Sequence, residues 1–319
     1  MRGFLLIFGV NSMKNIMIKT AIATAAVTAT TVSAFAAGHA KDHGVTVYGR
    51  LNVAAVCTDI DDDDCNIGNN GSRFGIKASS EVSDGLTAFA KYEFATDLNN
   101  GGKEEATRLG FVGLKGGFGE VSMGTRWNPM YNHTVSPIDA PNLSGGTSAP
   151  YGVTALTPYR VSNTLNYKNK FGAAAVGVQL GMGDGGKDLD SFTIGTSIPV
   201  GSATIGLAYA SDENSDVDAT SIHARTKFGA VGVGATYITT DDVDGVLLAL
   251  NYGMGGGKGL NLTYGQNMID GGGDPTSIGL EYLHNMGGGF KWYAGFESND
   301  SDGAGTDYDE YGVGMRYDF

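Results

Sequence analysis

Apolar and polar residues alternate along most of this chain with a period of two. The last nine residues, YGVGMRYDF, show the pattern: Tyr311, Val313, Met315, Tyr317 and Phe319 form an apolar series, with glycines and charged residues between them. Alternation of this kind predicts a β-strand whose two faces meet different surroundings. The chain therefore ends in a strand, whereas the termini of most soluble domains fray.

The same alternation recurs between turn residues along the chain, and it predicts sixteen strands in all. The predicted strands are 45–56, 72–82, 85–97, 104–116, 118–127, 159–169, 173–183, 189–199, 202–212, 217–228, 231–240, 243–254, 258–268, 275–286, 289–298 and 307–319. Prolines fall in the long connection 128–158, at a turn or at a strand edge, as expected where every strand is paired on both sides.

The connections between these strands alternate in length. Short turns such as VSDG, KGGF and PVGS are followed by longer connections rich in aspartate, asparagine and glycine. Short turns on one rim and long loops on the other are typical of a β-barrel that spans an outer membrane. The predicted fold is all-β: a transmembrane, 16-stranded, antiparallel up-and-down barrel.

One face of the predicted strands stays apolar and the other carries the charges. The apolar face includes Phe74, Ile76, Ala88, Ala90, Tyr92, Phe94, Leu109, Phe111, Val121, Met123, Trp127, Phe192, Ile194, Ile198, Ile205, Leu207, Tyr209, Leu260, Leu262, Tyr264, Ile278, Leu280, Tyr282, Phe290, Trp292 and Phe296. The opposite face includes Arg50, Arg73, Lys77, Glu93, Arg108, Arg126, Arg160, His223, Arg225, Glu281 and Lys291. Because an arginine at the bilayer midplane costs roughly 2–4 kcal/mol, the register is strongly specified.

A closed barrel has no free edge, so the last strand must pair with the first along its length. We expect 307–319 to seal against VTVYGRLNVAAV, residues 45–56. Tyr317 and Phe319 would then lie near the membrane interface, where aromatic rings are favoured.

The first residues read as an export signal. From Met13, two lysines precede a short apolar stretch that ends in Ala34-Phe35-Ala36, a small-residue cleavage site. We therefore expect residues 1–36, an upstream extension plus a signal peptide, to be removed, and 37–319 to form one exported domain. The formal net charge of −13 becomes more negative when this basic segment is lost, which disfavours nucleic-acid binding.

The chain has two cysteines, Cys57 and Cys65, in CTDIDDDDC. An oxidising compartment would join them in a disulfide, and two free thiols are the alternative. The aspartate run between them lacks the spacing of an EF-hand calcium loop, so a solvated acidic tip is expected and no metal site is predicted.

The order of several segments resembles the Gram-negative general diffusion porins. The segments are VTVYGRLNV, SRFGIKAS, LTAFAKYEF, TRLGFVGLKGGFGEVSMGTRWNP, YRVSNTLNY and the terminal strand that ends in phenylalanine. The resemblance implies an outer-membrane homotrimer of 16-stranded barrels that contacts lipids and lipopolysaccharide and lets small hydrophilic solutes and ions diffuse passively.

The resemblance also implies where the channel narrows. The third surface loop, here 128–158, would fold into the lumen, and the family's basic wall positions correspond to Arg50, Arg73, Arg108, Arg126 and Arg160. Glu93 matches a lumen carboxylate, and Asp139 is the only carboxylate in the inward loop, which departs from the PEFGG-like acidic motif of some members. Basic wall residues and acidic mouth loops oppose each other, so weak ion selectivity is expected.

Other function classes have weaker support. GMGDGG matches G-x-G-x-x-G but precedes a loop and another strand, so no helix N-terminus is available for a pyrophosphate. No serine is marked as an activated nucleophile, so no enzyme activity, catalytic residue or cofactor is predicted. The alternatives are a barrel for adhesion or anchoring and a barrel hydrolase.

Overall fold

The structure is a computed structural model that describes residues 41–59, 64–99, 103–139, 141–143, 159–183, 189–213, 215–303 and 305–319. The expected signal segment 1–36 lies outside these ranges, as do the acidic tip 60–63 and residues 144–158 of the expected constriction loop. Residues 42–319 form one compact unit.

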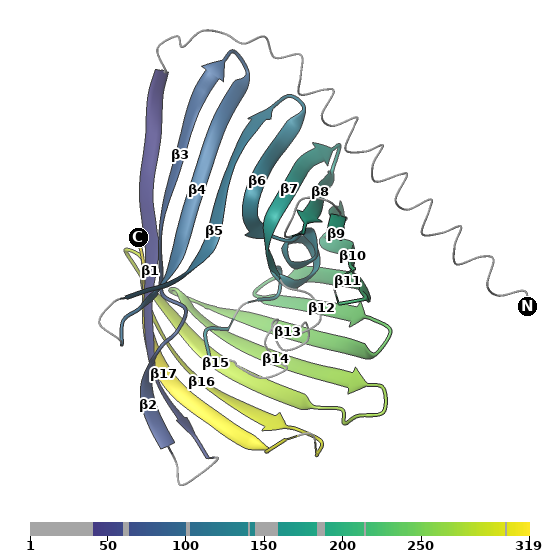
Figure 1. The fold of residues 1–319 in the computed structure, drawn as a ribbon. Coiled ribbons are helices and arrows are strands. Elements are labelled where there is room, and N and C mark those ends of the chain that lie inside the picture. The colour runs from purple at the N-terminus through teal and green to yellow at the C-terminus, as the bar shows by residue number, and fades with distance from the viewer. Residues whose placement is uncertain are drawn as a thin grey trace, which may run out of the picture. The chain divides into compact units, whose positions relative to one another are not determined.

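This unit is built almost entirely of strands (Figure 1). They are β1 (Lys41–Thr58), β2 (Asp64–Asn69), β3 (Arg73–Ser83), β4 (Leu86–Asp97), β5 (Lys103–Gly116), β6 (Gly119–Trp127), β7 (Arg160–Phe171), β8 (Ala174–Met182), β9 (Leu189–Val200), β10 (Ala203–Asp212), β11 (Val217–Phe228), β12 (Val231–Thr239), β13 (Val243–Gly255), β14 (Lys258–Ile269), β15 (Thr276–Gly287), β16 (Phe290–Asp300) and β17 (Tyr308–Asp318). Each predicted strand coincides with one of these elements to within a few residues.

Antiparallel pairing runs from β3 to β17 without a break and returns to β1. At the seam, β1 pairs with β17 from Arg50 opposite Asp318 to Thr58 opposite Glu310. Two further backbone hydrogen bonds join Gly49 and Phe319, at 2.9 and 3.1 Å. The predicted closure of the last strand on the first is therefore confirmed, and the barrel has no free edge at this position.

The short strand β2 was not expected, yet the barrel still has sixteen wall positions. β2 pairs with the second half of β1, from Val53 opposite Asn69 to Thr58 opposite Asp64, and β3 also pairs with β1. β2 and β3 are thus two parts of one interrupted strand. At the interruption the backbone N–H of Asn70 donates to the carbonyl of Asn52, and that of Asn52 donates to Ser72 Oγ, so pairing with β1 continues.

The two cysteines lie directly opposite each other in this β1–β2 hairpin. The structure joins Cys57 and Cys65 in a disulfide, with 4.0 Å between their Cα atoms. The same stretch of β1 pairs with β17 on its other side. The disulfide therefore crosslinks the wall at the seam.

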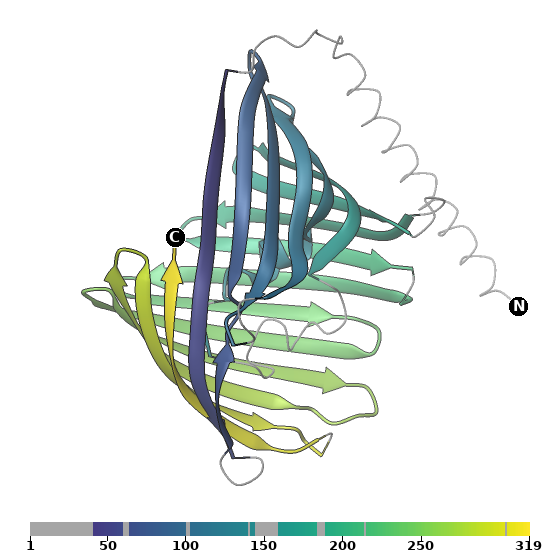
Figure 2. The same ribbon diagram turned by 60° about the vertical axis from the view of Figure 1, so that its left-hand side comes forward.

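The first half of β1 runs past the end of the chain. The register with β17 begins at Arg50, and Figure 2 shows β1 extending beyond the carboxyl terminus along β3. Such a stagger between first and last strands follows from the strand tilt of a closed barrel. The predicted short turns connect β3 to β4, β5 to β6 and β9 to β10, with glycines at positive φ such as Gly85 and Gly201.

The two faces of the wall differ as the alternation predicts. Large apolar side chains on one face are exposed, for example Ile76, Leu207 and Ile278 at 44%, 44% and 48%. Their neighbours on the other face are polar and include buried Ser221, His223 and Glu281. Large exposed apolar side chains on a closed ring of strands indicate a surface that faces lipid.

Three residues predicted on the apolar outer face lie elsewhere. A bulge in β5 places Thr107 opposite Phe94 and Leu109 opposite Glu93, so that Arg108 is an extra residue and the parity of the strand changes. Leu109 is consequently buried, and Phe111 pairs with Lys91 on the polar face. Trp127 packs against a buried cluster that includes Tyr131, instead of facing outward.

A short helical segment follows β6. Asn128 begins it: its side-chain Oδ1 accepts from the N–H of Tyr131 at 2.7 Å, and Pro129 occupies the first helical position. The segment η1 (Tyr131–Val135) contains a hydrogen bond from the N–H of Ser136 to the carbonyl of Tyr131, which spans five residues. No helix in the described ranges is long and apolar enough to cross a membrane.

Deleting Phe319 tests the seam. The variant loses both backbone hydrogen bonds to Gly49 and the ring contact with Tyr317, whose centroid lies at 6.1 Å. Because each hydrogen bond contributes about 1 kcal/mol and more where no water replaces it, we expect a lower unfolding temperature of the detergent-solubilised barrel. The unfolding temperature is measured by the heat-dependent mobility shift of the barrel in gel electrophoresis. Phe228→Ala, at an exposed turn, is the control, and equal unfolding temperatures for the deletion and the wild type would contradict the closure.

Candidate functional site

Charged side chains gather on the polar face of β1, β3, β4, β5 and β17. Glu93 on β4 is buried and accepts three contacts: from Arg108 Nε at 3.0 Å, from the Tyr48 hydroxyl at 2.8 Å and from Lys91 Nζ at 3.3 Å. The bulge at Arg108 turns this guanidinium toward Glu93. A carboxylate held by several donors stays ionised and orders the cations around it.

A second carboxylate, Asp318, lies at the carboxyl end of β17. It accepts from Arg50 Nε at 3.1 Å, Arg316 Nε at 2.9 Å and Lys291 Nζ at 2.9 Å. Three cations surround one carboxylate, so this part of the wall carries an excess of positive charge. The terminal strand β17 thus closes the barrel by pairing with β1 and also contributes charged groups to the polar face.

Arg73 lies between these two groups. Its guanidinium is repelled by Arg50 and Arg108 and attracted by Glu93. In the described part of the chain no carboxylate lies within 4.0 Å of it. Arg50, Arg73, Arg108 and Glu93, four of the predicted constriction residues, therefore belong to one cluster.

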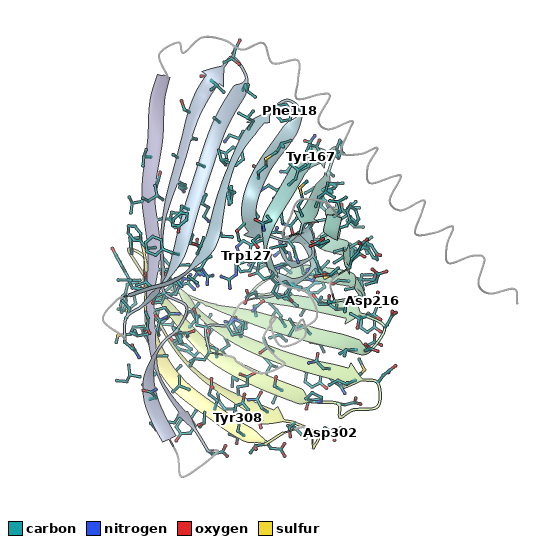
Figure 3. The ribbon with its side chains drawn as sticks, viewed as in Figure 1. Phe118, Trp127, Tyr167, Asp216, Asp302 and Tyr308 are labelled. Carbon is teal, nitrogen blue, oxygen red and sulfur yellow. A yellow bond between two sulfur atoms is a disulfide. The ribbon has the colours of Figure 1, made fainter. Side chains whose placement is uncertain are left out.

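The two other predicted arginines lie apart from this cluster. Arg126 bonds Glu120 at 2.6 Å and Ser122 at 2.5 Å, and its guanidinium lies 4.0 Å from the centroid of the Phe111 ring. Arg160 lies over the ring of Trp127 at 5.1 Å. Figure 3 shows Trp127 where β6 ends and the chain turns into the helical segment.

Asp139, the carboxylate expected on the loop, turns toward its own segment. Its Oδ2 accepts from the Tyr131 hydroxyl at 2.8 Å. Burial raises the pKa of Asp139, while this hydrogen bond and the charges of Arg50 and Arg73 oppose the shift. Asp139 therefore interacts with Arg50 and Arg73 by long-range electrostatic attraction and forms no ion pair with them.

Residues 128–139 and 141–143, which we call the inner segment, lie on the polar face of distant strands. His133 Nδ1 is 2.6 Å from Ser197 Oγ on β9, Thr236 Oγ1 on β12 donates to the carbonyl of Thr134 at 2.6 Å, and Arg225 on β11 reaches the carbonyl of Pro137 at 3.4 Å. Burial lowers the pKa of His133. The neutral ring can exchange a hydrogen bond with the serine in either tautomer.

Glycines in the wall make room for the inner segment. A Cβ at Gly206 would collide with the carbonyl of His133, one at Gly234 would collide with Ile138, and one at Gly195 would lie 2.7 Å from the carbonyl of Pro129. Apolar side chains fill the remaining space: Met130 packs with alanines of β10 and β11, and Ile138 packs in one cluster with Ile238 and Leu247. The segment is thus packed closely against the wall.

Glu281 on β15 holds the far end of the inner segment. Its carboxylate accepts from the backbone N–H groups of Asn142 and Leu143 at 2.6 and 2.9 Å, and from the side chains of Asn142 and Asn261. Arg316 also donates to Asn142 Oδ1 at 3.0 Å. This end of the segment therefore touches the Asp318 group.

Sequence reasoning missed several members of the site. Arg316 and Asp318 alternate with Met315 and Tyr317 in the last strand, so the parity of YGVGMRYDF already placed them on the polar face. The role of Glu281 as an anchor has no sequence signal, because its partners are backbone groups far away in the chain. Among the described residues no group of three histidine, cysteine, aspartate or glutamate side chains is placed to hold a metal ion.

Curated relatives of this chain are outer-membrane porins. It is 26% identical to the monosaccharide porin of a Halomonas species over 305 residues, which cover 82% of this chain and 81% of that protein. It is 26% identical to the putative outer membrane porin protein NmpC of Escherichia coli over 72% of this chain and 60% of the relative. It is 30% identical to outer membrane porin C of Rahnella aquatilis, over 31% of this chain and 29% of the relative. The chain thus spans less than two thirds of the length of the last two relatives.

Solved structures share the fold. The anion-selective porin of Comamonas acidovorans superposes with a TM-score of 0.71 at 19% identity, over 87% of this chain and all of that one. The trimer form of OmpT from Vibrio cholerae superposes with a TM-score of 0.68 at 19% identity, over 88% of this chain and all of that one. A family model described as Gram-negative porin matches residues 23–304. With its closed barrel and lipid-facing outer surface, this chain is an outer-membrane protein and belongs to the Gram-negative porin family.

Proposed function

We propose that this protein forms a water-filled channel through which small hydrophilic solutes and ions diffuse passively across the outer membrane. The observation that carries the proposal is the enclosure of the charged face, with Glu93, Asp318 and their cations, by a closed ring of strands whose other face is apolar. A ring of sixteen strands is wide enough to leave an aqueous lumen. Solutes cross because that lumen keeps them hydrated.

The inner segment narrows this channel. It belongs to the connection between β6 and β7, which are neighbours in the ring, yet its residues bond β9, β12, β15 and β17. A connection between neighbouring strands reaches the polar face of strands so far around the ring only by crossing the interior. Its polar partners and the close-fitting glycines support this location. Solutes then pass between the inner segment and the arginine cluster of Arg50, Arg73 and Arg108.

Ion selectivity is weak in this proposal. Arg50, Arg108, Arg126 and Arg316 all pair with carboxylates, which reduces the field that they exert on passing ions. Arg73 adds positive charge at the narrow part, while the loops around Asp216 and Asp302 carry acidic groups at the opposite end from the short turns (Figure 3). The two contributions oppose each other.

We also propose a homotrimer whose outer surface contacts lipids and lipopolysaccharide, and a protein without catalytic chemistry. The trimer form of a solved structural neighbour and the broad apolar surface of the wall support the assembly. Relatives named as porins, and the absence of a marked nucleophile in the sequence, support transport over hydrolysis or adhesion.

Planar-bilayer recording of the purified protein tests the channel. We expect stepwise increases of conductance in groups of three, because each trimer would insert three pores together. Under a gradient of potassium chloride the reversal potential should be small in either direction, since the mouth and wall charges counteract each other. Bilayers that stay closed at high protein concentration would refute the channel, and a reversal potential near the ideal value for one ion would refute the weak selectivity.

Replacing Glu281 with glutamine tests the inner segment as the constriction. The variant weakens charged hydrogen bonds to Asn142 and Leu143, a loss on the order of 2 kcal/mol, and so loosens the end of the segment. We expect larger current noise in the open channel with unchanged unfolding of the barrel. The control is Glu81→Gln, which changes an exposed carboxylate on β3. Equal noise in both variants would place the segment outside the path of ions.

A further inference from the structure

A wall pocket lies between the arginine cluster and the short-turn rim, and Lys91, which pairs with Glu93, borders both. Its volume is ≈ 320 Å³, and β1, β3, β4, β5 and β6 contribute to it. Its lining combines cationic and aromatic side chains, Lys77, Lys91, Lys115, Arg126, Phe89 and Phe111, with the carboxylate of Glu120. Passive diffusion of hydrophilic solutes does not require aromatic rings beside these charges.

Two aromatic rings of this part of the wall, Tyr48 near the pocket and Phe89 in its lining, pack against glycines. Tyr48 faces the polar side, since its hydroxyl donates to Glu93, and a Cβ at Gly75 would collide with its ring. Phe89 lies opposite Gly113 in the β4–β5 pair, and a Cβ there would lie 2.6 Å from its ring. Two glycines therefore make room for two rings on the polar face of the wall.

Cations lie over the rings of Tyr48 and Phe111 but not over that of Phe89. Lys91 and Lys77 lie 4.9 and 5.9 Å from the centroid of Tyr48, and Arg126 lies 4.0 Å from that of Phe111. Within the described ranges no ammonium or guanidinium lies over Phe89, which meets Phe111 edge-on at 6.2 Å. Because Phe89 is partly exposed and lines the pocket, its ring can contact a flat apolar group there.

The positive charge of the pocket is not balanced. Lys91 pairs with Glu93, and Arg126 pairs with Glu120, which also binds Lys168. In the described part of the chain, Lys77 forms no ion pair with a carboxylate, whereas Lys115 lies directly opposite Glu120 in the β5–β6 register. Lys77 also lies directly opposite Lys91 in the β3–β4 register, an arrangement that is unfavourable unless an anion or solvent screens it.

We propose that this pocket binds small planar carboxylates that carry an aromatic ring. The ring of the ligand packs on Phe89 beside Phe111, and its carboxylate pairs with the ammonium group of Lys77, which faces the like charge of Lys91 across the register. The inference rests on the proposed channel, because solutes reach the pocket from the lumen, and it adds a preferred class of solute to that function.

The combination of groups distinguishes this class from others. Inorganic phosphate would use the lysines but gain nothing from the rings, and a neutral sugar would use the rings but leave the lysines without a counter-charge. Ammonium groups act as point charges and suit a carboxylate at variable angles. A planar aromatic carboxylate uses both.

The experiment uses the purified full-length protein and sodium benzoate as the probe. Calorimetric titration in detergent measures binding directly, and planar-bilayer recording measures block of the potassium chloride current. Cyclohexanecarboxylate, which has the same charge but no flat ring, and benzyl alcohol, which has the ring but no charge, are the comparison ligands. We expect benzoate to bind and to block more tightly than either.

Two variants locate the site, and one provides the control. Lys77→Gln should weaken benzoate binding roughly tenfold, as for the loss of one charge-assisted hydrogen bond. Phe89→Leu should leave the affinity for cyclohexanecarboxylate unchanged while removing the preference for benzoate. Lys227→Gln removes the same charge from an exposed position at the end of β11 and should change neither.

The outcomes separate this inference from the proposed function. Potassium chloride currents without benzoate binding or block would overturn the pocket and leave the channel intact. Benzoate binding that depends on Lys77 and Phe89 in a protein that conducts no ions would overturn the channel and support the pocket. Equal affinities for benzoate and cyclohexanecarboxylate would show a charge effect alone and would also overturn the proposal.

Discussion

Hydrogen bonding of the backbone inside hydrocarbon is the constraint on which the rest of the structure depends. No water is available there to satisfy a free N–H or carbonyl group, so every strand needs two neighbours and the sheet must close. The pairing of β1 with β17, extended by the reciprocal bonds between Gly49 and Phe319, meets this requirement. The clean alternation of the last strand follows from it, because a strand at the seam has lipid on one side and the lumen on the other.

Closure creates an interior, and the interior is where charge can be placed. Glu93 and Asp318 each hold several cations on the inner face, and the inner segment approaches the same region through Asn142 and Arg316. The segment itself depends on small residues of the wall, since Gly195, Gly206 and Gly234 leave space for its backbone and for Ile138. Wall and inner segment are therefore matched in shape as well as in polarity.

The sequence predicted the fold more fully than the site, for a physical reason. Strand existence, the seam and the polar-face location of Arg50, Arg73 and Glu93 follow from an alternation with a period of two, which can be seen within each short stretch of the sequence. The bulge at Arg108 is not local, because it depends on how β5 meets β4, and it moved Leu109 and Phe111 to the inner face. Likewise the direction of Asp139 and the anchor at Glu281 depend on contacts between segments far apart in sequence. The interruption between β2 and β3 was also missed, since Asn70 and Ser72 look like part of an ordinary loop.

The central claim is that, of two adjacent residues in one strand, one faces lipid and the other faces water. Nitroxide labels at Ile76 and Lys77, made as separate cysteine variants in a background where Cys57 and Cys65 are serine, test it most directly in reconstituted bilayers. The account predicts that the label at position 76 relaxes faster with oxygen, which concentrates in lipid. It predicts that the label at position 77 relaxes faster with a water-soluble nickel complex. Equal access of both labels to the nickel complex, or protection of both from both reagents as in a packed protein core, would contradict it.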